Sequence, residues 1–196
     1  MRGVFCLRIA RVLAMGAGMT PDALKSLIRT IPDFPKPGIE FRDITTLIGH
    51  GEGFAACVAM LAERAQAAGA QAIAGMEARG FIFGAAVAAK LALPFIPVRK
   101  PGKLPVPVLA VDYALEYGTD RLEVDPDAVG AGQRVVVVDD LIATGGTALA
   151  AVQLLRRAGG EVAQALFVID LPDLGGAEKL REAGVPVQAV MAFAGH

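Results

Sequence analysis

From residue 51 onward, helical and strand-like patterns alternate along the chain, and this alternation limits the folds that the sequence can adopt. Apolar residues recur at helical spacing in some stretches and form short β-branched runs in others. Alternating strands and helices favour right-handed crossover units, which build a parallel sheet with helices on both faces. The sequence therefore predicts an α/β fold whose binding site lies at the carboxyl ends of the strands.

The expected elements follow one another through short connections. Helices are predicted over residues 23–29, 52–68, 80–91, 147–158 and 176–183, and strands over 70–75, 95–98, 134–139, 162–170 and 187–193, with a short pair of strands within 111–124. Residues 100–107 contain three prolines and a glycine, which favours a mobile loop over a domain boundary. We interpret residues 1–19 as an extension from an early start codon, outside the native fold, and residues 20–196 as one domain.

Size and charge narrow the class of partner. With 196 residues, 54% of them hydrophobic, the chain is long enough for one well-packed domain. A net charge of -1 and a pI near 6.1 provide no overall field that would attract nucleic acid or an anionic membrane. The most apolar stretch, residues 81–98, is interrupted by a lysine and two prolines, so it is too short for a bilayer span. We therefore expect small-molecule ligands, no nucleic acid, no membrane and a cytoplasmic location.

Cysteines and histidines are too few in this sequence for a metal cage. Cys6 and Cys57 are far apart and match no zinc or redox spacing, and His50 and His196 are the only histidines. We predict reduced cysteines and no metal site made by protein groups alone.

The most informative segment is residues 135–147, which read VVVVDDLIATGGT. Four consecutive valines suit a strand that is buried on both faces. Two glycines between threonines let backbone N–H groups surround an anion at a helix N-terminus. No lysine follows the glycines, so the P-loop spacing is not met, and the dinucleotide fingerprint is absent too. We interpret Thr144, Gly145, Gly146 and Thr147 as a phosphate site, and these residues together with Ala143 before them are called the phosphate loop below.

Two carboxylates, those of Asp139 and Asp140, precede the phosphate loop. They would repel a polyphosphate unless an uncharged or positive group lay between them. A ribose fits that place, because its two hydroxyls can donate to the carboxylates while its 5-phosphate lies on the loop. Positive charge developing at the anomeric carbon would be favoured nearby. The alternative is a capped strand end with two solvated aspartates.

This segment resembles the phosphoribosyl-diphosphate binding motif of the type I phosphoribosyltransferases. Four further stretches, residues 34–44, 77–81, 99–105 and 115–118, are similar to the adenine phosphoribosyltransferases of that family. The resemblance covers residues 20–196 and implies a central, mainly parallel sheet flanked by helices, with a small N-terminal hood and a flexible lid loop. It also implies the reaction: transfer of the 5-phosphoribosyl group from phosphoribosyl diphosphate to adenine, giving AMP and pyrophosphate in purine salvage.

The resemblance implies roles for individual residues. Asp139 and Asp140 would hold the ribose hydroxyls, and the phosphate loop would hold the 5-phosphate. Arg79 would face pyrophosphate. The alternative is that it is an exposed residue that only forms a salt bridge. A non-proline cis peptide bond would fall just before it, near residues 77–78. Glu116 would be the general acid/base near the purine nitrogen that changes protonation, although a surface glutamate is the alternative.

The lid and the hood would complete the site. Arg99, Lys100 and Lys103 concentrate positive charge on the proline-rich interval, as expected of a lid that closes over pyrophosphate; solvated loop charges are the alternative. Tyr117 would contact substrate from the lid, unless it only packs on its strand.

Base contacts are implied for three further residues. Phe41 and Arg42 belong to the hood that covers the purine, and Leu171, after the strand 162–170, would form a wall of the base pocket. Each has a structural alternative: Phe41 and Leu171 as core residues, and Arg42 as the partner of Asp43 or another carboxylate.

Magnesium is expected because the leaving pyrophosphate carries several negative charges, which a hard cation can bridge to the ribose hydroxyls. The family is commonly dimeric, which implies a homodimer. Two alternative functions are a phosphoribosyltransferase for another base and a non-catalytic regulator that senses phosphoribosyl diphosphate and binds nucleic acid. The hood sequence favours adenine, and no basic face or added DNA-binding segment is visible in the sequence. The missing lysine and paired aspartates disfavour a generic nucleotide-binding module.

Overall fold

The computed structural model describes residues 19–115 and 118–195, and these form two compact units, residues 19–60 and residues 61–195. The predicted extension, residues 1–19, lies almost entirely outside the described residues. Among the described helices, none is both long and apolar enough to cross a membrane.

The first unit is built around a small antiparallel hairpin. Helix α2 is shorter than predicted, because the chain has entered a strand by Arg29, and that residue pairs with Asp43 across the hairpin. Thr20 caps α2 by accepting a hydrogen bond from the backbone N–H of Ala23. The elements are α2 (Pro21–Lys25), β1 (Arg29–Pro32), β2 (Glu40–Asp43), α3 (Thr45–Ile48) and the first part of α4 (Gly51–Ala67).

The second unit contains the predicted parallel sheet. Its five strands are hydrogen-bonded in the order β4-β3-β7-β8-β9, and every neighbouring pair is parallel. The α/β prediction is therefore confirmed. The strands are β3 (Ala72–Met76), β4 (Phe95–Val98), β7 (Arg134–Ile142), β8 (Glu161–Asp170) and β9 (Val187–Ala192).

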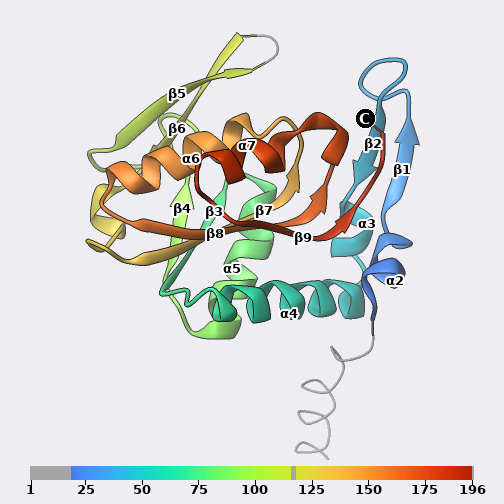
Figure 1. The fold of residues 1–196 in the computed structure, drawn as a ribbon, viewed down its shortest axis with the longest axis horizontal. Helices are drawn as coiled ribbons and strands as arrows, with labels where there is room; N and C mark the ends of the chain where they lie inside the picture. Colours follow the sequence, from blue (N-terminus) through green and yellow to red (C-terminus); the bar gives the residue numbers. More distant parts are fainter. Residues whose placement is uncertain (1–18, 116–117, 196) are drawn as a thin grey trace, which may run out of the picture. The chain divides into compact units, whose positions relative to one another are not determined.

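Helices cover both faces of this sheet (Figure 1). Helix α5 (Arg79–Leu91) lies on one face, and α6 (Gly146–Arg157) and α7 (Gly176–Glu182) lie on the other. The four valines at 135–138 are fully buried, as predicted, because alternate side chains of β7 pack against the helices of opposite faces. This two-sided core fixes the carboxyl ends of β3 and β7 side by side.

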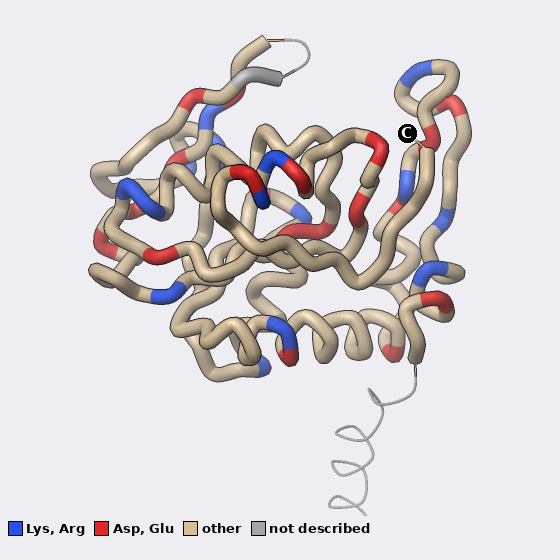
Figure 2. The backbone as a smooth tube through the Cα atoms, in the orientation of Figure 1, with Lys and Arg blue, Asp and Glu red and all other residues tan. Residues whose placement is uncertain are grey.

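Two further strands form a separate antiparallel ribbon beside α6 (Figure 1). They are β5 (Leu109–Leu115) and β6 (Gly118–Val124), which match the predicted pair of strands. Single 3-10 turns, η1 (Pro126–Ala128) and η2 (Pro172–Leu174), follow β6 and β8. Basic and acidic residues are interspersed along the described backbone (Figure 2).

Candidate active site

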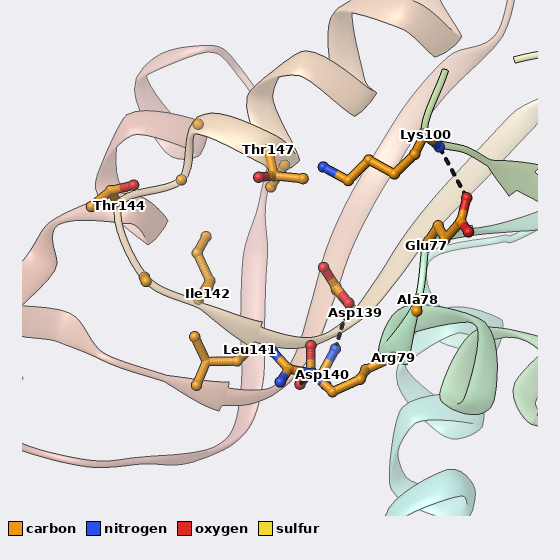
Figure 3. Close-up of a pocket in the computed structure, with 14 residues that line it drawn as sticks. Glu77, Ala78, Arg79, Lys100, Asp139, Asp140, Leu141, Ile142, Thr144 and Thr147 are labelled. Carbon is orange, nitrogen blue, oxygen red and sulfur yellow. Dashed lines mark hydrogen bonds and ion pairs between the residues drawn. The ribbon is translucent and has the colours of Figure 1, made fainter. Parts of the chain in front are cut away.

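A cavity of about 410 Å³ opens at the carboxyl ends of β3 and β7 (Figure 3). This is the edge at which parallel α/β sheets bind ligands. The lining comes from the last residues of β7, the loop that leads into α6, the turn between β3 and α5, and Lys100 after β4. The lining residues are Glu77, Ala78, Arg79, Lys100, Asp139, Asp140, Leu141, Ile142, Ala143, Thr144, Gly145, Gly146, Thr147 and Ala148.

The phosphate loop joins β7 to α6 and lines the cavity along its full length. Gly145 has a φ of +81°, a left-handed conformation that favours glycine, and it turns the chain into the helix. The first N–H groups of a helix have no partner within the helix, so they attract an anion at this end of α6. The loop is supported from outside by Lys179, whose Nζ donates to the carbonyl oxygen of Thr144 at 3.0 Å.

The paired carboxylates stand at the floor of this cavity. The side chain of Asp140 is buried and its Oδ2 lies 2.6 Å from Nε of Arg79, which is half-exposed at the start of α5. Burial and the charge of Asp140 raise the pKa of Asp139 well above its usual range. Burial also raises the pKa of Asp140, although the Arg79 guanidinium opposes this rise. Gly80 leaves room for the pair, since a Cβ atom there would lie 2.6 Å from Oδ1 of Asp139.

The turn between β3 and α5 forms the opposite wall. The Glu77-Ala78 peptide bond is cis, as the family resemblance implied. Glu77 accepts hydrogen bonds from Nε of Arg99 at 3.2 Å and from the backbone N–H of Lys100 at 3.0 Å. These contacts hold the pKa of Glu77 below its usual range. The predicted lid, residues 99–105, is called the lid segment below and is thereby attached to the wall of the cavity. The Lys100 side chain points across the cavity toward Thr147 (Figure 3).

The structure thus gathers most of the predicted sugar-phosphate and diphosphate residues in one cavity. Lys103 is exposed on the loop, and among the described residues that line the cavity neither Lys103 nor Leu171 occurs. Leu171 is buried just after β8 and donates its backbone N–H to Ile142 at 3.1 Å. Glu116 and Tyr117 lie outside the described residues.

Phe41 and Arg42 lie on β2 of the first unit. The Phe41 ring makes an edge-to-face contact with Phe34 at 5.2 Å between centroids. Arg42 forms an ion pair with Glu40 at 2.5 Å, whereas Asp43 forms its ion pair with Arg29.

Several residues of the site were not singled out from the sequence. Glu77 belongs to the stretch 77–81 that carries the family resemblance, and in the structure it joins the lid segment to the cavity wall. Tyr113 and Asp120, directly opposite on the β5–β6 ribbon, contact Lys100. Their spacing around the ribbon turn was an available signal, but an acidic and an aromatic residue on a strand are too common to indicate a site.

Comparison with known proteins defines the class. The family described as phosphoribosyl transferase domain matches residues 46–182, a range that includes the whole cavity. The fold is therefore that of a type I phosphoribosyltransferase, and the cavity lies within the matched domain.

Individual relatives with high sequence identity narrow the family further. An adenine phosphoribosyltransferase of Novosphingobium aromaticivorans is 72% identical over 91% of this chain and 100% of its own. One from Azorhizobium caulinodans is 57% identical over 90% of this chain and 98% of its own. The chain belongs to the adenine phosphoribosyltransferase family.

Solved structures agree with this assignment. The adenine phosphoribosyltransferase of Thermoanaerobacter pseudethanolicus is 47% identical, with a TM-score of 0.84 over 89% of this chain and 100% of its own. That of Saccharomyces cerevisiae, solved with adenine and an imino-altritol bisphosphate, is 35% identical, with a TM-score of 0.82 over 87% of this chain and 98% of its own.

Proposed function

We propose that the protein transfers the 5-phosphoribosyl group from phosphoribosyl diphosphate to adenine, giving AMP and pyrophosphate, as a purine-salvage enzyme. The observation that carries the proposal is the end of β7, where the half-buried Asp139 and the buried Asp140 lie just before an amide-lined loop at the start of α6. Acids that can accept from a diol, beside amides that can donate to a phosphate, match a ribose 5-phosphate group in charge and in hydrogen bonding.

In this mechanism a purine nitrogen displaces pyrophosphate at the anomeric carbon, through a transition state with oxocarbenium character and with inversion of configuration. Asp139 and Asp140 hold the ribose hydroxyls, and their charge favours the positive charge that develops on the sugar. Arg79 at the mouth of the same cavity can form two parallel hydrogen bonds with oxygens of the leaving diphosphate. Lys100 and Lys103 add positive charge on the lid segment.

The purine end of the site is assigned to residues outside this cavity. Glu116 acts as the general acid/base at the purine nitrogen, with Tyr117 beside it on the lid. Phe41 and Arg42 of the hood and Leu171 after β8 contact the base. These assignments come from the family resemblance.

A magnesium ion fits the oxygen-rich chemistry of the cavity. Hard cations prefer carboxylate, phosphate and hydroxyl oxygens, and they often keep several waters when bound through a substrate diphosphate. The described residues contain no group of three or more His, Cys, Asp or Glu that could hold a metal. We propose that Asp139 and Asp140, which grip the ribose hydroxyls, would hold a Mg²⁺ ion only indirectly, together with the bound diphosphate. When bound, such an ion would supply positive charge that stabilises the leaving pyrophosphate.

We further propose that the protein is a homodimer, as the family resemblance implies, and that it is located in the cytoplasm. Light scattering during size-exclusion chromatography measures the oligomer, and fractionation of cells measures the compartment.

The assay that tests the proposed function supplies Mg²⁺, phosphoribosyl diphosphate and one base at a time. We expect AMP and pyrophosphate with adenine, and far slower product formation with hypoxanthine, guanine, xanthine or uracil. Efficient formation of another nucleoside monophosphate would assign a different base, and the absence of every product would overturn the enzymatic assignment.

A further inference from the structure

Among the described residues, one lysine lines the cavity, and a carboxylate outside the cavity is bound to it. The Nζ of Lys100 forms an ion pair with Oδ2 of Asp120 and donates to the hydroxyl of Tyr113 at 3.1 Å. Tyr113 in turn donates to Oδ2 of Asp120 at 2.9 Å. The three groups form a closed triangle between the β5–β6 ribbon and the lid segment.

The pairing of β5 with β6 holds two of the three groups of this triangle side by side. Tyr113 and Asp120 are directly opposite each other on β5 and β6, so their side chains project from the same face. The Tyr113 hydroxyl also lies 3.3 Å from Oγ1 of Thr147, at the end of the phosphate loop. The ribbon is therefore joined to both the predicted diphosphate lysine and the phosphate loop.

Partial burial strengthens the ion pair. The side chains of Lys100 and Asp120 are 36% and 26% exposed, so solvent screens their attraction only in part. Burial alone would lower the pKa of Lys100, yet hydrogen bonds to Asp120 and Tyr113 raise it. The same bond lowers the pKa of Asp120. Both groups are thus charged at neutral pH.

A carboxylate at this place works against an anionic ligand. A diphosphate bound near Lys100 must share its ammonium with Asp120, and it also meets the negative charge of that carboxylate. An ammonium has three N–H donors, of which Asp120 and Tyr113 accept two. A ligand oxygen can take the third or displace Asp120 from its own.

We propose that Asp120 sets the affinity of this site for diphosphate by competing for the ammonium group of Lys100. The inference rests on the proposed function, in which Lys100 binds the pyrophosphate group. Competition of this kind weakens the hold on both the substrate diphosphate and the released pyrophosphate, and so it favours product release.

The experiment is calorimetric titration of the full-length protein with pyrophosphate in the presence of Mg²⁺. Asp120→Asn removes the charge and keeps the shape, and we expect it to tighten pyrophosphate binding by roughly three- to tenfold, the range that suits a partly screened ion pair. Ribose 5-phosphate, which has no diphosphate, should bind the variant and the wild type equally well.

The matched control is Asp112→Asn. Asp112 is 69% exposed on the same ribbon, lies 3.5 Å from Arg121 and is opposite it on the neighbouring strand. This variant changes the net charge by the same amount and should leave pyrophosphate binding unchanged. Equal tightening by both variants would mean a general field effect and would overturn the inference.

Lys100→Met separates failure of this inference from failure of the proposed site. Lys100→Met alone should weaken pyrophosphate binding, and in its background Asp120→Asn should have no further effect. If Lys100→Met leaves pyrophosphate binding unchanged, the diphosphate assignment fails and the inference fails with it. Two results would overturn only the inference, provided that Lys100→Met weakens pyrophosphate binding. One is that Asp120→Asn does not tighten binding, and the other is that it still tightens binding in the Lys100→Met background.

Discussion

The backbone N–H of Gly176 donates a hydrogen bond of 3.0 Å to the carbonyl oxygen of Ala143, so the start of α7 packs directly against the phosphate loop. A Cβ atom at Gly176 would lie 2.2 Å from that oxygen and 2.6 Å from the backbone nitrogen of Gly145. Backbone atoms cannot give way as the tip of a side chain can. The loop conformation therefore depends on the absence of a side chain at a residue about thirty positions further along the chain.

Gly176→Ala should displace the phosphate loop. We expect kcat/KM for phosphoribosyl diphosphate to fall by roughly a hundredfold, the effect typical of a misplacement of about 1 Å in a binding loop. Steady-state kinetics and the melting temperature measure the change. Gly175→Ala is the control: its φ of +69° makes alanine strained, but a Cβ atom there meets nothing within 4 Å, so stability should fall with kinetics preserved. Equal kinetic losses in both variants would refute the steric explanation.

Arg79→Ala should weaken the binding of diphosphate. The guanidinium lines the cavity and is half-exposed beside Asp140, so it can reach a ligand. Loss of hydrogen bonds to a charged group predicts a rise of roughly ten- to a hundredfold in KM for phosphoribosyl diphosphate, with adenine KM little changed. Arg79→Lys should recover only part of the loss, because an ammonium cannot form the two parallel bonds. Unchanged inhibition by pyrophosphate in Arg79→Ala would contradict the assignment.

Glu116→Gln should slow the chemical step and leave the sugar-phosphate site intact. Removal of a general acid/base predicts a fall in kcat of roughly a hundredfold or more, with nearly unchanged binding of phosphoribosyl diphosphate. Pre-steady-state kinetics and a separate binding titration distinguish the two effects. Wild-type turnover in this variant would show that another group moves the proton.

Asp139→Asn should stabilise the ligand-free protein at neutral pH and weaken the binding of ribose 5-phosphate. Because burial and Asp140 raise the pKa of Asp139, ionisation of this carboxyl opposes folding at every pH above the raised value. That penalty shrinks with falling pH, as the wild-type carboxyl takes up its proton. It vanishes below pH 3.8, the ordinary pKa of an aspartate. The difference in melting temperature between variant and wild type should therefore be greatest at alkaline pH and decline as the pH falls toward 4. A difference independent of pH would argue that the charge of Asp139 is not its cause.

Local patterns in the sequence determined the main strands and the phosphate loop. The valines at 135–138 read as a buried strand, and the two glycines after Thr144 read as a turn into a helix, because each feature depends on neighbours a few positions away. The predicted boundaries of the helices and strands were less accurate. The strand β7 was predicted to end at Asp139, where polar residues begin, but it continues through Ile142 because Leu141 and Ile142 pair with β8. The short strands β1 and β2 were not predicted, since their four-residue sequences show no clear alternation of apolar and polar residues.

Only the tertiary structure decided which distant residues meet. Arg79 reaches Asp140 because β3 and β7 are neighbours in the sheet, although the two residues are 61 positions apart in the sequence. Lys100 meets Asp120 because the β5–β6 ribbon folds back beside the lid segment, and Gly176 meets Ala143 because α7 packs on the phosphate loop. The sequence by itself therefore determined the kind of chemistry, which lies in one short segment. Sheet order and packing decided its partners, because contacts between distant segments arise only when the whole core forms.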